Sequence, residues 1–80
     1  MYTYSPKGVC SRQITFDVVD GKVKDVKFVG GCNGNLKGIG VLIEDMPIDE
    51  AIKKLKGITC GNRPTSCPDQ LSKALEEVKN

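Results

Sequence analysis

The sequence has 80 residues, 39% of them hydrophobic and 28% charged, with a formal net charge of +2. This composition is typical of one small globular domain and excludes a disordered segment. The apolar runs are too short to cross a membrane and the first residues do not resemble a secretory signal, so we expect a cytoplasmic protein. Four aromatic residues, none of them tryptophan, argue against direct binding of nucleic acid. The absence of histidine excludes Ser-His and Cys-His catalytic pairs.

The first third of the chain predicts β-strands. Apolar residues alternate with polar ones on both sides of a turn signal, Asp20-Gly21, and this period of two is typical of half-buried strands. A short edge strand at 2–4, ended by Pro6, precedes them. The alternating apolar residues are Ile14, Phe16 and Val18 before the turn, and Val26 and Phe28 after it.

The register of this hairpin follows from its apolar face. A three-residue loop at 20–22 places Ile14 opposite Phe28, so that both strands bury the same side. The same register places Cys10 opposite Cys32 at the open end of the hairpin. We therefore expect these two thiols to lie close together.

The second half of the chain predicts three helices, because its apolar residues recur at helical spacing. A capping pattern, Ser66-Cys67-Pro68-Asp69, begins the last helix, and Gly57 follows the end of the middle one. Strands followed by helices indicate an α+β domain, a small antiparallel sheet covered on one face by two or three helices. The apolar stripes are Leu36, Ile39, Leu42 and Ile43, then Ile48, Ala51, Ile52 and Leu55, and finally Leu71, Ala74, Leu75 and Val78.

The four cysteines are the chemically unusual feature of the chain. Cys10, Cys32, Cys60 and Cys67 form no Cys-x-x-Cys pair, but we expect them at turns and helix starts, outside the apolar stripes. Backbone amides and the positive end of a helix dipole favour thiolates at such places. Four thiolates that meet at one end of the sheet would suit zinc or an iron–sulfur cluster. Inert buried thiols, disulfides and a redox-active pair are the alternatives.

Three segments of the sequence resemble the TSCPD domain family. They are the pentapeptide Thr65-Ser66-Cys67-Pro68-Asp69, the glycine-rich stretch 30–35 around Cys32, and 57–61 around Cys60. The resemblance covers nearly the whole chain, as one domain over 1–80. The domain of this family resembles a C-terminal module of adenosylcobalamin-dependent ribonucleotide reductases. This implies a role in deoxyribonucleotide synthesis, accessory to a ribonucleoside-diphosphate reductase, because 80 residues cannot hold the catalytic barrel itself.

A second resemblance, to the U-type iron–sulfur assembly scaffolds, rests on the order of elements. Cys10, Cys32 and Cys67 match the three scaffold cysteines, while Arg12 and Ser66 stand where the scaffolds carry an acidic residue and commonly a histidine. It implies a scaffold-like fold and, as an alternative function, assembly of a labile cluster. A thiol relay through Cys60 and Cys67, a plain interaction domain and a homo-oligomer also stay open.

Overall fold

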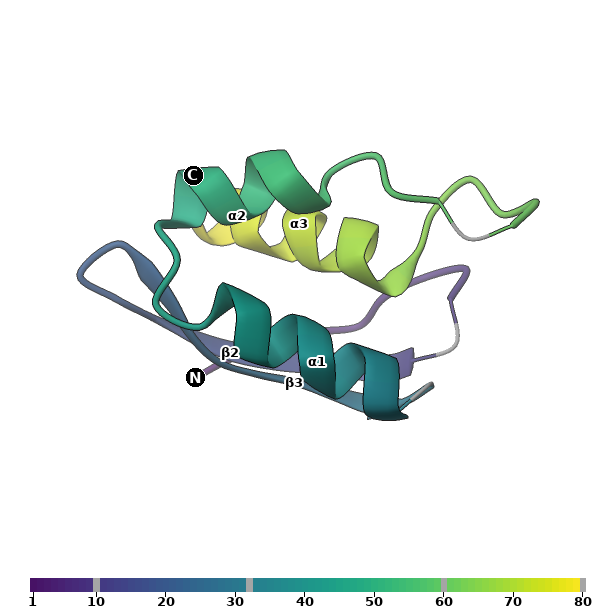
Figure 1. Ribbon diagram of the computed structural model, residues 1–80, viewed down its shortest axis with the longest axis horizontal. Coiled ribbons are helices and arrows are strands. Elements are labelled where there is room, and N and C mark those ends of the chain that lie inside the picture. Colours follow the sequence, from purple (N-terminus) through teal and green to yellow (C-terminus); the bar gives the residue numbers. More distant parts are fainter. Residues whose placement is uncertain (10, 32, 60, 80) are drawn as a thin grey trace.

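The computed structural model describes residues 1–9, 11–31, 33–59 and 61–79. The strands form one antiparallel sheet in the order β1-β2-β3, and the helices lie on one side of it (Figure 1). This arrangement confirms the predicted α+β class. In chain order the elements are β1 (Tyr2–Tyr4), β2 (Ser11–Val19), β3 (Lys22–Gly30), α1 (Asn33–Ile43), α2 (Ile48–Leu55) and α3 (Cys67–Lys79).

A two-residue turn joins β2 and β3. Asp20 and Gly21 both have positive φ, 53° and 74°, as a type I′ turn requires, and Val19 pairs with Lys22 directly behind them. The predicted three-residue loop is therefore wrong. Aspartate followed by glycine adopts the I′ conformation readily, and its twist matches that of the flanking strands.

The predicted pairing of Ile14 with Phe28 is nevertheless confirmed, because a β-bulge restores it. Two residues of β3, Asp25 and Val26, lie opposite Phe16 alone, and the register changes by one residue at this point. Asp25 has a φ of 52°, and its backbone N–H donates to the Glu44 carboxylate over 2.9 Å. The bulge keeps the apolar side chains of both strands on the same face.

A second irregularity near the open end of the hairpin shifts the register back. The last described pair of the ladder is Ser11 opposite Gly30, one residue off the predicted register. The expected proximity of Cys10 and Cys32 lies outside the described residues. The structure shows that their described neighbours Ser11 and Gly30 pair in the ladder.

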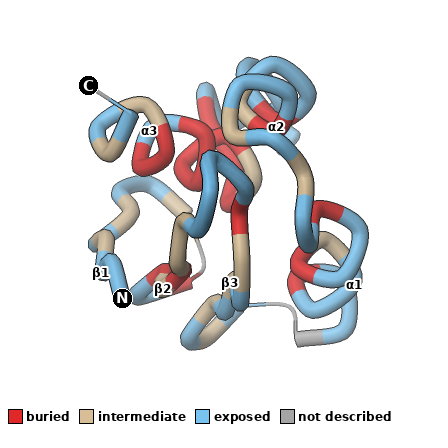
Figure 2. The backbone as a smooth tube through the Cα atoms, turned by 90° about the vertical axis from the view of Figure 1, so that its left-hand side faces the viewer, coloured by how far each residue is buried: buried red, intermediate tan, exposed pale blue. Residues whose placement is uncertain are grey.

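The hydrophobic core lies between the sheet and the helices. Figure 2 shows stretches of buried residues on the sheet and on all three helices. The sheet and all three helices contribute to it, and the predicted apolar stripes of α2 and α3 supply most of its helical side. Its buried members are Ile14, Phe16 and Val23 from the sheet, and Ile43, Ala51, Leu55, Leu71, Ala74 and Leu75 from the helices.

Helix α1 packs closely against β3. A Cβ atom at Gly40 would lie only 2.9 Å from the Val26 carbonyl oxygen, so glycine permits this approach. Leu36 and Ile43 are buried, but Leu42 is exposed, and its predicted burial is wrong. The helix touches the rest of the domain along one side only, and Leu42 lies on the side turned away.

Candidate metal centre at the start of the last helix

Cys67 is the first residue of α3, and its side chain is only 9% exposed. A hydrogen bond of 3.1 Å joins its Sγ to the hydroxyl of Ser11, the buried first residue of β2. Cys67 also lies four residues before Leu71 and so continues the apolar stripe of α3 by one turn. Cys67 stands at a helix start, as predicted, and it is buried although it is not a member of the core cluster.

Ser11 links this thiol to the segments that carry two more cysteines. It directly follows Cys10 in the sequence, and it pairs across the ladder with Gly30, two residues before Cys32. Cys10 and Cys32 themselves lie outside the described residues. Their described neighbours therefore meet at the place where the Cys67 thiol is buried.

The loop that carries the fourth cysteine is fixed to the same end of the molecule. The Ser66 hydroxyl donates to the backbone carbonyl of Ile58 over 2.6 Å, and Ile58 precedes Cys60 by two residues. Cys60 itself is also outside the described residues. In Figure 1 the start of β2, the end of β3 and the starts of α1 and α3 all lie at the right-hand end of the molecule.

Ser66 also caps α3, as the sequence predicts. Its Oγ accepts a hydrogen bond from the backbone N–H of Asp69 over 3.2 Å, and Pro68 lies in the first turn, where a missing N–H costs nothing. Donation to Ile58 and acceptance from Asp69 use the same hydroxyl. The cap of the helix and the position of the preceding loop therefore depend on one side chain.

The Asp69 carboxylate holds the segments on either side of that loop. Its side chain is 6% exposed, and its two oxygens accept hydrogen bonds from the backbone N–H of Gly57 (2.8 Å) and the hydroxyl of Thr65 (2.6 Å). The Thr65 bond, and then the Gly57 bond, lower the pKa of Asp69 below its usual 3.8. Gly57 has a φ of 85°, which glycine adopts without strain just after a helix.

Gln70 extends this polar network to the N-terminal segment. Its Nε2 donates to the Thr65 Oγ1 over 3.0 Å, and its Oε1 accepts from the Lys7 backbone N–H (3.1 Å) and the Tyr4 hydroxyl (3.4 Å). Sequence reasoning did not identify Gln70, Thr65 or Ser11 as part of the site. In the sequence, Gln70 stands out only as a polar residue directly before Leu71 of the predicted apolar stripe.

Among the described residues, no three His, Cys, Asp or Glu side chains are arranged so that they could hold a metal ion. Every buried side-chain nitrogen or oxygen in the described part of the chain has a hydrogen-bond partner. Both carboxylate oxygens of Asp69 accept hydrogen bonds within the protein.

The fold and this site define a small α+β domain in which the segments flanking four cysteines come together at one end of the sheet. The TSCPD domain family model matches residues 2–79, and the chain belongs to this family. No curated protein and no solved structure matched the chain. None of the helices in the described ranges is both long enough and apolar enough to span a membrane.

Proposed function

We propose that this domain is a metal-binding module in which Cys10, Cys32, Cys60 and Cys67 hold zinc or an iron–sulfur cluster. The observation that carries the proposal is the 3.1 Å contact between the Cys67 thiol and Ser11. It joins the first residue of α3 to the residue that follows Cys10. The Ser11–Gly30 pair and the Ser66–Ile58 hydrogen bond add the segments that carry Cys32 and Cys60.

The available donors fit such a group. The chain has no histidine, and Asp69, the buried carboxylate near Cys67, is engaged by Gly57 and Thr65. Sulfur is therefore the donor that this end of the molecule offers, and all-cysteine sites suit zinc and iron–sulfur clusters. When bound, zinc would crosslink the four segments, and a cluster would also carry an electron. Ser11 would hold the Cys67 sulfur in place with its hydrogen bond.

The burial of Cys67 favours a ligand over a thiol relay. Thiol–disulfide exchange requires that an attacking thiolate reach the sulfur, and a side chain only 9% exposed restricts that access. Metal binding also contributes free energy to folding, which benefits an 80-residue domain with a small core. Both arguments favour a mainly structural site.

The family supports an accessory role beside a ribonucleotide reductase. TSCPD domains resemble a C-terminal module of the adenosylcobalamin-dependent reductases, and a three-stranded sheet with three helices is too small to form a catalytic barrel. We propose that the metal-loaded domain docks on such an enzyme in the cytoplasm and does not turn over nucleotides by itself. A reductase turnover rate that is the same with and without the added domain would contradict this part of the proposal. That result would not bear on the metal-site part of the proposal.

Elemental analysis and a visible spectrum of untagged protein, purified without oxygen, test the metal site. We expect about one zinc per chain without colour, or iron and sulfide with a brown chromophore. Cys67→Ser should lose most of the metal. Ala74→Ser, which also adds a hydroxyl to the buried face of α3, should retain it. A protein without metal whose unfolding is unchanged by a strong chelator would overturn the proposal.

A further inference from the structure

Helix α1 carries apolar residues on the side that faces away from the domain. Val41 and Leu42 are 69% and 78% exposed, and Gly38 stands next to them with nothing within 4 Å of where a Cβ would lie. At about 100° per residue, Gly38 and Val41 lie roughly 150° from the buried side formed by Leu36 and Ile43, and Leu42 lies roughly 110° from it. We call Gly38, Val41 and Leu42 the outer face of α1.

The other exposed helix surfaces of this domain are charged. On α2, Glu50 pairs with Lys54, and Asp49 pairs with Lys79 of α3, as is typical of helices that face water. Lys37, by contrast, is the one charged residue among the 11 of α1. A helix that is apolar on both sides is normally buried on both sides. The outer face of α1 therefore has the character of an interface.

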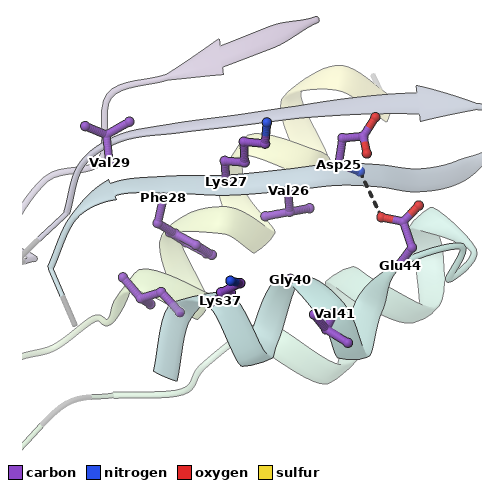
Figure 3. A pocket seen from close by; sticks show the side chains of 10 residues that line it. Asp25, Val26, Lys27, Phe28, Val29, Lys37, Gly40, Val41 and Glu44 are labelled. Atoms are coloured by element: carbon purple, nitrogen blue, oxygen red, sulfur yellow. Dashed lines mark hydrogen bonds between the residues drawn. The ribbon is translucent and has the colours of Figure 1, made fainter. Parts of the chain in front are cut away.

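A groove continues this apolar surface along β3. It has a volume of about 690 Å³ and lies between the outer part of β3 and α1. Figure 3 shows Val26 and Phe28 pointing from β3 toward α1, with Lys37 and Val41 on the helix side. The outer face and the groove share Val41, so one partner can cover both.

The charges along α1 favour a second copy of this chain as the partner. Lys37 lies in the first half of the helix, whereas Glu44 and Asp45 follow its end. Asp45 already pairs with Lys24. Glu44, whose carboxylate accepts only the Asp25 N–H among the described residues, is therefore the acidic group for Lys37 of the other copy. In an antiparallel pair around a two-fold axis, each Lys37 approaches the acidic end of the other helix, and the two helix dipoles oppose each other favourably. An axis near residue 40 also places Leu42 of one copy against the open space at Gly38 of the other.

We propose that the domain forms a symmetric dimer through antiparallel packing of α1 against α1. The proposal is independent of the metal site, because the outer face of α1 shares no residue with the Cys67 network. Sedimentation velocity of the untagged, reduced protein from about 1 to 500 μM should show a monomer–dimer equilibrium. A small interface of this kind corresponds to a dissociation constant of micromolar order.

Two substitutions at the outer face test the geometry. Leu42→Glu buries an unpaired charge in the dimer and should weaken it about 100-fold. Val19→Glu makes the same change at a residue that is 51% exposed on the hairpin, and should leave the dimer unchanged. Gly38→Leu improves helix propensity and has room in the monomer, but fills the space for Leu42 of the partner. It should abolish the dimer without lowering the stability of the monomer.

Several results would overturn the proposal. The first is a monomer at every concentration, and the second is a dimer that Leu42→Glu and Gly38→Leu leave intact. Metal content should be the same in these variants as in the wild type. A wild-type dimer that a strong chelator dissociates, and that Leu42→Glu and Gly38→Leu leave intact, would mean that thiol–metal crosslinks and not α1 join the copies.

Discussion

Replacing Asp69 tests the polar network that fixes the start of α3. Asp69→Ala removes the acceptor of the Gly57 N–H and of the Thr65 hydroxyl. The Thr65 hydroxyl is left in a buried place, whereas Gly57 is exposed and its N–H can bond to water instead. A buried hydrogen bond to a charged group is worth about 1.5–3 kcal/mol and the one to the exposed Gly57 less, so the free energy of unfolding should fall by about 2–4 kcal/mol. That is a large share of the roughly 4–12 kcal/mol expected for 80 residues.

Asp69→Asn separates the charge from the shape of the side chain. The amide oxygen can still accept from Gly57, and the amide nitrogen can donate to the Thr65 oxygen, so the loss should be about 1–2 kcal/mol. The matched control is Asp49→Ala, an exposed aspartate in the first turn of α2 that forms a surface ion pair with Lys79. It should cost about 1 kcal/mol or less.

Urea unfolding followed by circular dichroism, with reductant and metal content held constant, measures these differences. The depressed pKa of Asp69 adds a pH signature. Its stabilisation is complete above about pH 4 and is lost as the pH falls through the folded-state pKa. The gap between wild type and Asp69→Asn should therefore narrow in acid. Equal effects of Asp69→Ala and Asp49→Ala would refute the reasoning.

Two further predictions concern packing and pH. Gly40→Ala should destabilise the domain by about 1–2 kcal/mol, because its Cβ would lie 2.9 Å from the Val26 carbonyl, whereas Gly38→Ala should stabilise it by about 0.5–1 kcal/mol in thermal unfolding. The opposite order would contradict the α1–β3 contact. Burial raises the pKa of Tyr4 above 10.0. The stabilisation that the neutral Tyr4 hydroxyl contributes is therefore complete below about pH 10 and is lost as the pH rises through the folded-state pKa of Tyr4. Tyr4→Phe should reduce the alkaline loss of stability, and identical curves for both proteins would argue against it.

The sequence predicted the elements of the fold well, because periodicity and turn chemistry are local signals. It missed the turn length, since an Asp20-Gly21 turn and a bulge at Asp25 together give the same apolar pairing as a longer loop. Both solutions bury the same face, so alternation alone does not distinguish them. The exposure of Leu42 was missed for a similar reason. Helical spacing identifies an apolar stripe but not the width of the surface that covers it.

The candidate site was predictable only in part. Ser66 and Asp69 follow a capping pattern that can be recognised within four residues. The partners of Gln70 come from the N-terminal segment, Tyr4 and Lys7, more than 60 positions away. Such contacts depend on how the chain ends come together, and no local pattern encodes them. The contact between Ser11 and Cys67 belongs to the same class.

The residues of the pentapeptide 65–69 therefore hold one end of this domain together. Thr65 bridges Asp69 and Gln70, Ser66 caps the helix and holds the preceding loop, and the Asp69 carboxylate binds Gly57. Four of its five residues thus have a structural role that needs no ligand, since Pro68 suits the first turn. The thiol of the fifth is held where the neighbours of the other three cysteines converge. The string that identifies the family therefore holds this end of the domain together, and it does so through hydrogen bonds that do not involve a metal.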